Sequence, residues 1–213
     1  MGNLKIPEEA IRRLSRYSRC LEEMEKNGGR VVSSVELAGK CRVKAHQVRK
    51  DLSYFGEFGI RGVGYYVKDL LREIKRILGL NKEWRMAVVG IGNLGSALLS
   101  YKDFLKQNYK IVAAFDIDPA KVIGRVSEKL GKPVEVLHIS RVREAVKERK
   151  IEIGLITTPA SEAQKVANIL VEAEVKGILN FAPAQITVPE GYVVKDAFFT
   201  TILDNLAYLL SST

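Results

Sequence analysis

The chain has 213 residues, which is enough for one large domain or two modest ones, and we expect two. No run of about 18 apolar residues occurs, and the N-terminus lacks the apolar region of a secretory signal, so we expect a soluble, cytoplasmic protein without a membrane span. The two cysteines, Cys20 and Cys41, fit no metal-ligand spacing, so we expect no metal site. Two thiols in a chain of this size do not suggest a disulfide framework, and we expect them to be reduced and packed.

The formal net charge of +9 is concentrated in the first part of the chain. Residues 1–85 contain 19 Lys and Arg against 11 Asp and Glu, whereas residues 86–213 contain 15 against 14. A basic module joined to a nearly neutral one is typical of a nucleic-acid-binding domain attached to a ligand-binding domain. A basic surface that only keeps the protein in solution explains the charge equally well.

Three helices are predicted first. Apolar residues at helical spacing indicate an amphipathic helix between Pro7 and Gly28. Ser33 and Glu36 have the spacing of a capping box, which opens a second, short helix that ends near residue 39. A third helix covers roughly residues 44–54.

A glycine-punctuated segment, residues 55–67, then predicts a small β-hairpin. Three helices followed by a hairpin are the order of a winged helix-turn-helix domain. A further amphipathic helix over about 67–78 and a polar link place the domain boundary near residue 82.

The third helix has the composition of a DNA-recognition helix. With Val48 and Leu52 turned inward, its polar residues lie on the outer faces, where Gln can pair with adenine and Arg or Lys with guanine. Arg61, in the glycine-rich turn, is placed to contact a minor groove or the backbone as a wing. A solvated cationic helix face is the alternative. The predicted DNA-binding residues are Ser34, Lys44, His46, Gln47, Arg49, Lys50, Ser53, Tyr54 and Arg61.

Beyond residue 82, apolar runs typical of strands alternate with helical patterns. This alternation predicts an α/β fold, a doubly wound parallel sheet with helices on both faces. Strands are expected over residues 86–90, 111–115, 134–139, 153–157 and 177–182, and helices starting near residues 94, 140 and 161.

The first of these strands leads into the sequence Gly90-Ile91-Gly92-Asn93-Leu94-Gly95, which opens a helix. In a Rossmann domain the first glycine allows the tight turn, the second lets the backbone approach a pyrophosphate, and the third lets helix and strand pack closely. The motif alone is short, but its place between a strand and a helix predicts a nicotinamide dinucleotide site.

Three further positions extend this site. Asp116 ends the second strand, where a carboxylate accepts hydrogen bonds from the adenosine ribose and favours NAD over NADP, although Lys121 and Arg125 lie near. The fourth and fifth strands end in Thr158-Pro159 and Asn180-Phe181, which suit a nicotinamide ring and its carboxamide. Ordinary strand-end turns explain these two segments equally well.

Four segments together resemble the family of the redox-sensing transcriptional repressor Rex. They are residues 47–56 (QVRKDLSYFG), 61–65 (RGVGY), 90–95 and 177–183 (GILNFAP). The resemblance implies a homodimer that binds an inverted-repeat operator, a Rossmann core that binds NADH or NAD+, and repression that NADH relieves. It divides the chain into a winged helix at 1–82, a Rossmann domain at 83–195 and a domain-swapped C-terminal helix at 196–213.

Exchange of the last helix would cover the apolar tail from Phe198 to Leu210. In the family, residues just before this helix approach the partner's nicotinamide pocket, a role that Phe199 suits. The resemblance also implies a switch between the domains, for which Arg16 and Tyr101 are the candidate partners. Phe198 occupies the position of the family's aspartate, and Asp196, two residues earlier, is the candidate for that role.

Three rival functions stay open. An NAD-dependent dehydrogenase with a basic accessory domain needs a proton-transferring group, yet His46 and His138 are the only histidines and no catalytic constellation is evident. The second rival is a regulator with a related Rossmann domain that binds coenzyme A or another nucleotide. The third is a thiol-based sensor that uses Cys20 or Cys41.

Overall fold

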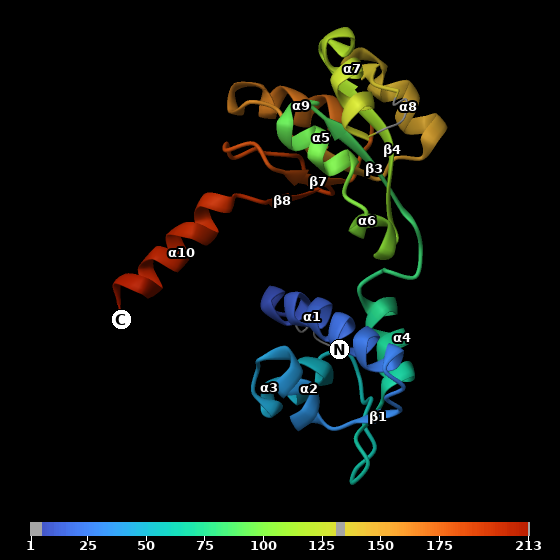
Figure 1. Cartoon of the computed structure of the whole chain (residues 1–213), viewed down its shortest axis with the longest axis vertical. Helices are drawn as coiled ribbons and strands as arrows, with labels where there is room; N and C mark the ends of the chain where they lie inside the picture. The colour runs from blue at the N-terminus through green and yellow to red at the C-terminus, as the bar shows by residue number, and fades with distance from the viewer. Residues whose placement is uncertain (1–5, 131–134, 213) are drawn as a thin grey trace. The chain divides into compact units, whose positions relative to one another are not determined.

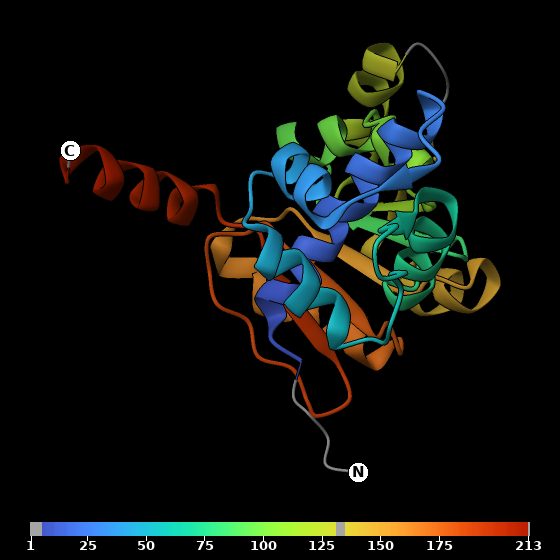
Figure 2. The ribbon, with the colours of Figure 1, turned by 90° about the horizontal axis from the view of Figure 1, so that it is seen from below.

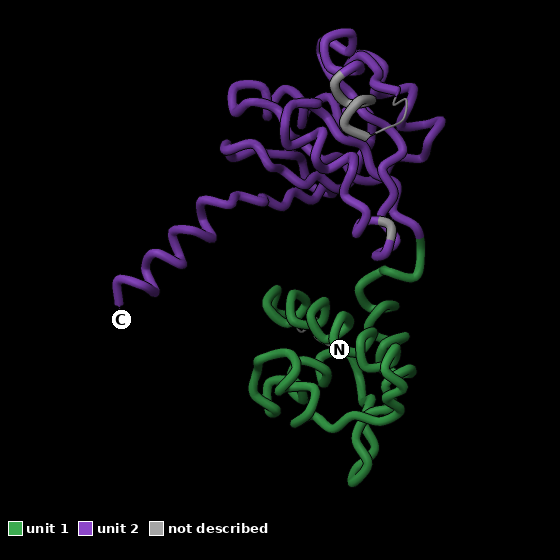
Figure 3. Tube along the Cα trace, viewed as in Figure 1, with its two compact units in different colours: residues 1–82 green, residues 83–213 purple. Residues whose placement is uncertain are grey.

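The computed structural model describes residues 6–130 and 135–212. It divides into two compact units, unit 1 at residues 1–82 and unit 2 at residues 83–213, which are coloured separately in Figure 3. Each unit is described by itself.

Unit 1 contains the four predicted helices. Its capping box forms as expected: Ser33 Oγ accepts a hydrogen bond from the Glu36 amide at 3.1 Å, and Glu36 Oε2 accepts one from the Ser33 amide at 2.8 Å. The core lies between the helices, where Leu14, Tyr17 and Val48 are fully buried. The helices are α1 (Glu8–Lys26), α2 (Ser34–Cys41), α3 (Ala45–Ser53) and α4 (Val67–Ile77).

The wing differs from the predicted hairpin. Strand β2 (Tyr65–Tyr66) pairs antiparallel with β1 (Val31–Val32), which precedes α2, and not with the segment just before it. Residues 60–64 close a tight turn through a single bridge. Gly64 explains the pairing, because it has a φ of +109° and a Cβ on it would lie 2.6 Å from the Val32 carbonyl oxygen. The glycine therefore lets the turn pack directly on β1.

Unit 2 is built on a six-stranded sheet that is fully parallel, as predicted, with the strand order β5-β4-β3-β6-β7-β8. Figure 1 labels β3, β4, β7 and β8 of this sheet. In chain order these strands are the third, second, first, fourth, fifth and sixth, which is the order of a Rossmann fold. The last strand was not predicted, and part of the expected strand at 134–139 lies outside the described residues. The strands are β3 (Trp84–Val89), β4 (Tyr109–Asp116), β5 (Leu137–His138), β6 (Ile153–Ile156), β7 (Gly177–Asn180) and β8 (Val193–Asp196).

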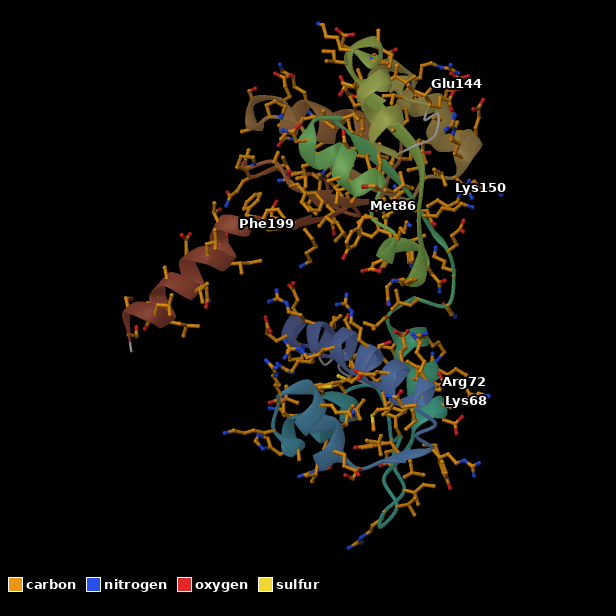
Figure 4. The ribbon with its side chains drawn as sticks, in the orientation of Figure 1. Lys68, Arg72, Met86, Glu144, Lys150 and Phe199 are labelled. Atoms are coloured by element: carbon orange, nitrogen blue, oxygen red, sulfur yellow. The ribbon has the colours of Figure 1, made fainter. Side chains whose placement is uncertain are left out.

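Helices cover both faces of the sheet, and alternate residues of β3 point toward opposite faces. Ala87 and Val89 pack with apolar residues of α8 and α9, whereas Met86, labelled in Figure 4, and Val88 pack in a second cluster with residues of α5, α6 and α7. The helices are α5 (Asn93–Leu99), α6 (Asp103–Lys106), α7 (Pro119–Leu130), α8 (Val142–Arg149), preceded by a 3-10 turn at Ile139–Arg141, and α9 (Ala160–Glu172).

The last helix, α10 (Phe199–Ser211), leaves the sheet after β8 and runs away from the rest of unit 2 in both views (Figures 1 and 2). All of its residues are exposed, including Leu203 at 59% and Leu206 at 51%. A contiguous apolar stripe of this kind normally marks an interaction surface.

Candidate functional site

A cavity of about 520 Å³ opens beyond the carboxyl ends of β3 and β6 in unit 2. These strands flank the point where the strand order reverses, which is where open α/β sheets bind ligands, and the volume is that of an ordinary ligand site. Apolar side chains from β3, α7 and α9, together with Ile139, form much of its wall. Of the predicted cofactor residues, Gly90, Ile91, Gly92, Asp116, Thr158 and Pro159 line it.

The three motif glycines differ in what surrounds them. Gly90 has a φ of +94°, and a Cβ on it would lie 2.7 Å from Thr158 Cγ2. A Cβ on Gly95 would collide with the Gly90 carbonyl oxygen and lie 3.0 Å from Thr157 Oγ1. By contrast, nothing lies within 4 Å of a Cβ position on Gly92. The chain thus fills the space beside two glycines and leaves the third open toward a ligand.

Because of this difference, alanine at Gly95 and alanine at Gly92 should affect stability and NADH binding differently. We expect Gly95→Ala to destabilise unit 2 by about 1–3 kcal/mol, because the added methyl displaces the turn, and to weaken NADH binding. Gly92→Ala should leave the melting temperature unchanged and still lower NADH affinity at least about tenfold, because its methyl fills the space in which a pyrophosphate would lie. Calorimetric melting and fluorescence titration with NADH measure both effects. Wild-type NADH affinity in Gly92→Ala would contradict the pyrophosphate assignment.

Asp116 is fixed beside the glycine turn. Its Oδ2 accepts a hydrogen bond from the Ile91 amide at 2.7 Å, and its Oδ1 accepts one from the Asp118 amide at 2.9 Å. These bonds orient the carboxylate at the cavity edge, with lone pairs left for ribose hydroxyls. Lys121, which raised doubt about excluding NADP, forms an ion pair with Asp118 at 2.6 Å.

The predicted nicotinamide residues fall into two groups. Thr158 Oγ1 is buried at the cavity without a hydrogen-bond partner in the described part of the chain, so it is available to a ligand. Asn180 is fully buried away from the cavity lining, and its amide is engaged by the chain itself. Its Nδ2 donates to the Ala184 carbonyl and to Asp196 Oδ1, both at 2.8 Å, and its Oδ1 accepts from the Ala182 amide at 3.0 Å.

Phe181 and Phe199 are not among the residues that line the cavity, and their rings face each other. Their ring centroids are 6.5 Å apart and their planes are tilted by 36°. Phe199 begins α10 where the chain leaves the sheet, as labelled in Figure 4, and it remains 61% exposed. The other predicted cofactor residues, Asn93, Leu94 and Gly95, lie in the first turn of α5.

In unit 1, α3 presents the predicted cationic face. Val48 and Leu52 are buried as expected, while Lys44, His46, Arg49, Lys50 and Ser53 are exposed and Gln47 and Tyr54 are partly exposed. Arg49 Nη1 donates to Ser34 Oγ at 2.8 Å, so these two predicted residues lie together at the surface of α2 and α3. Arg61 is exposed in the wing turn beside Gly62, whose φ is +81°.

Asp51, which was not predicted as a site residue, is fully buried on α3. Arg13 binds its carboxylate in a bidentate manner at 2.6 and 2.8 Å, the Tyr17 hydroxyl donates at 2.7 Å, and Gln47 Nε2 donates at 2.8 Å. Burial by itself would raise the pKa of Asp51, but the hydrogen bonds from Arg13, Tyr17 and Gln47 outweigh it and hold the pKa below the ordinary value. Asp51 therefore joins α3 to α1 and orients Gln47.

The three predicted switch residues occupy different settings. In unit 1, Arg16 is exposed on α1 and its Nη1 donates to the Cys41 carbonyl at 3.3 Å. In unit 2, Tyr101 is 53% exposed and makes an edge contact with Phe104, with ring centroids 4.9 Å apart. Asp196 ends β8 and binds Asn180.

His138, the one histidine of unit 2, is exposed and its Nδ1 pairs with Ser140 Oγ at 2.8 Å. Across residues 6–130 and 135–212, no group of three or more His, Cys, Asp or Glu side chains could hold a metal ion. None of the described helices combines the length and apolarity that crossing a membrane requires.

Two family descriptions match the chain, one in each unit. Residues 5–53 match a family described as "Putative DNA-binding protein N-terminus", and residues 81–184 match one described as "CoA binding domain".

Similar proteins cover almost the whole chain. The redox-sensing transcriptional repressor Rex of Syntrophobacter fumaroxidans is 51% identical over 97% of both chains. The protein of the same name from Carboxydothermus hydrogenoformans is 49% identical over 98% of both chains, and that from Thermus thermophilus is 45% identical over 97% of this chain and 95% of its own.

Solved structures of a Rex-family repressor called RSP are similar in fold. RSP in complex with β-NAD+ and operator DNA has a TM-score of 0.86 at 36% identity, covering 97% of this chain and 93% of its own. RSP in complex with β-NADH has a TM-score of 0.82 at 34% identity, covering 99% and 96%.

Proposed function

Because the chain belongs to the Rex family of redox-sensing transcriptional repressors, we propose that it represses transcription as a homodimer on an inverted-repeat operator and leaves the operator when NADH binds. It is a regulator and not an enzyme. We assign residues 1–82 to DNA binding, 83–195 to NAD(H) binding and 196–213 to an exchanged dimerisation helix. As a repressor it acts in the cytoplasm, where bacterial operators lie.

One observation carries the proposal: the same chain has a cavity at the switch point of a Rossmann sheet and an exposed cationic helix in a separate winged-helix unit. The open space at Gly92, the carboxylate of Asp116 and the unpartnered Thr158 hydroxyl fit a pyrophosphate, a ribose and a polar group of the nicotinamide end. RSP, whose structures contain β-NAD+ or β-NADH, supports a dinucleotide in preference to the coenzyme A of the family description.

On the DNA, we propose that α3 enters the major groove and Arg61 contacts the minor groove or backbone. Arg49 and Lys50 are exposed for bases or phosphates, while Gln47 is oriented by Asp51. Because a two-fold dimer reads two half-sites, the half-sites should be separated by whole helical turns. Ser34, Lys44, His46, Ser53 and Tyr54 complete the proposed contact set.

The proposed redox discrimination depends on the nicotinamide surroundings. When bound, the cofactor supplies a ring that is cationic in NAD+ and neutral in NADH. We propose that Phe181 and the partner's Phe199 give the ring apolar surroundings, in which desolvation costs less for a neutral ring than for a charged one. Because Phe199 begins the helix proposed to be exchanged, ring binding can bias the arrangement of the dimer. Arg16, Tyr101 and Asp196 are proposed to transmit that bias to the winged helices.

The test is an operator titration at fixed salt. An operator is first selected from random duplexes with the cofactor-free protein, and its affinity is then measured with added NADH, NAD+, NADPH or coenzyme A. NADH should weaken operator binding about 5–150-fold, which is the usual range of coupling between two sites, and operator DNA should weaken NADH binding by the same factor. The other three ligands should have smaller effects.

Two outcomes would overturn this function. An operator affinity that NADH does not change would remove the proposed release mechanism. Catalytic oxidation of NADH with any of a panel of carbonyl substrates would favour the dehydrogenase.

A further inference from the structure

The chain's two cysteines meet inside unit 1. Cys20 on α1 and Cys41 at the end of α2 are 21 positions apart in the sequence, and their sulfur atoms lie 2.8 Å apart, with the Cys41 thiol donating to the Cys20 sulfur. A disulfide has an S–S distance of about 2.05 Å, so a bond requires the sulfurs to approach by only about 0.8 Å.

The surroundings hold the two residues in this position. Cys41 is 2% exposed in the helical core, and its carbonyl accepts a hydrogen bond from Arg16, which also lies on α1. Cys20 is only partly buried, so a small oxidant in solution reaches its sulfur more readily than that of Cys41. Burial, and then the hydrogen bond to Cys20, raise the pKa of the Cys41 thiol, which keeps this group protonated and unreactive by itself.

We propose that Cys20 and Cys41 are an oxidation site at which a peroxide forms an intrachain disulfide between α1 and α2. In the first step the Cys20 thiol loses its proton to solvent and the thiolate attacks hydrogen peroxide. The O–O bond breaks, the Cys20 sulfenic acid forms, and the leaving hydroxide takes up a proton to give one water. In the second step the Cys41 sulfur attacks Cys20, the S–S bond forms, the S–O bond breaks, and a second water leaves. Two thiols are oxidised by two electrons in total, and a dithiol reverses the change.

The consequence for the winged helix is stabilisation without rearrangement. Because the sulfurs are already close, cross-linking leaves α3 and its DNA-facing residues where they are. The disulfide restricts the unfolded chain between residues 20 and 41, and it protects both sulfurs from irreversible oxidation. Formation of this disulfide takes place within unit 1 and does not depend on a cofactor in unit 2.

The experiment treats the full-length, natively folded protein with hydrogen peroxide and follows it by intact mass and peptide mapping. We expect a loss of about 2 Da per chain, a Cys20–Cys41 cross-linked peptide, and full recovery with dithiothreitol. The melting temperature of unit 1 should rise on oxidation and fall on reduction, while operator affinity changes less than about twofold. Each of these results should be the same with saturating NADH.

Single variants test the order of the steps. Cys41→Ser should accumulate sulfenic acid at Cys20, detectable with a 1,3-diketone probe, whereas Cys20→Ser should react far more slowly because its remaining thiol is buried. Oxygen additions in place of the mass loss, a disulfide between two chains, or loss of operator binding on oxidation would each overturn the proposal. Equal oxidation rates for the two variants would overturn the assigned order.

Discussion

Replacing both Leu203 and Leu206 by aspartate converts the protein into a folded monomer with greatly weakened operator binding, if α10 is the dimerisation helix. At 100° per residue, both leucines lie on one apolar stripe of α10, and each is more than half exposed in the single chain. Two carboxylates placed there must be desolvated for a partner to cover the stripe, which is unfavourable without cationic partners.

The loss of operator affinity follows from the loss of two-point attachment. A dimer holds a second winged helix near its half-site, and such linkage commonly raises affinity by about 10²–10⁴-fold over one site. We therefore expect the double variant to lose operator affinity by a factor in that range. Sedimentation velocity measures the oligomeric state, and an operator titration at fixed salt measures the affinity.

A matched control exists on the same helix. Thr201 and Asn205 lie on the face opposite the leucines, so Thr201→Asp with Asn205→Asp adds comparable charge without touching the stripe. This control should stay dimeric and bind the operator. A leucine variant that stays dimeric would show that α10 is not the interface, and a monomer with wild-type operator affinity would show that dimerisation is not needed for binding.

Local patterns allowed much of the fold to be predicted from the sequence. The capping box at Ser33 and Glu36 is a contact between near neighbours, and it forms as expected. The glycine turn is equally local, because the positive φ of Gly90 and the tight space beside Gly95 are requirements of a few adjacent residues. Asp116 was predicted at the ligand site because it ends a strand, and it lines the cavity.

Pairings between distant segments could not be predicted. Strand β2 pairs with β1, more than 30 residues earlier, because Gly64 permits a close approach that only the folded unit defines. The sulfurs of Cys20 and Cys41 meet through the packing of α1 on α2. Asn180 Nδ2 donates to Asp196 at the end of β8, a strand that was not predicted. In each case tertiary packing determines which two segments meet, and no periodic pattern in the sequence marks the pair.

The buried carboxylate of Asp51 gives the second large prediction. Asp51→Ala should destabilise unit 1 by about 3–5 kcal/mol, because it leaves the Arg13 guanidinium and the Tyr17 hydroxyl without the carboxylate that pairs them. Operator binding should weaken as well, since Asp51 holds α3 against α1 and orients Gln47. Calorimetric unfolding of the full chain measures the first effect, with NADH binding by unit 2 as the check on folding elsewhere.

The dependence on pH distinguishes the charge from the shape of this side chain. The folded-state pKa of Asp51 lies below its ordinary value of 3.8, so its stabilising contribution is fully present above that pH and is lost as the pH falls through the folded-state pKa. Asp51→Asn, which keeps the shape, should therefore differ most from wild type near neutrality and approach it below pH 3.8. The exposed ion pair of Asp69 and Arg72 supplies the matched control. Asp69→Asn, in the same unit, should lower the free energy of unfolding by less than about 1 kcal/mol at any pH. If Asp51→Asn were as mild as this control, the buried network would not be what fixes α3, and this helix would be held by the packing of Val48 and Leu52 alone.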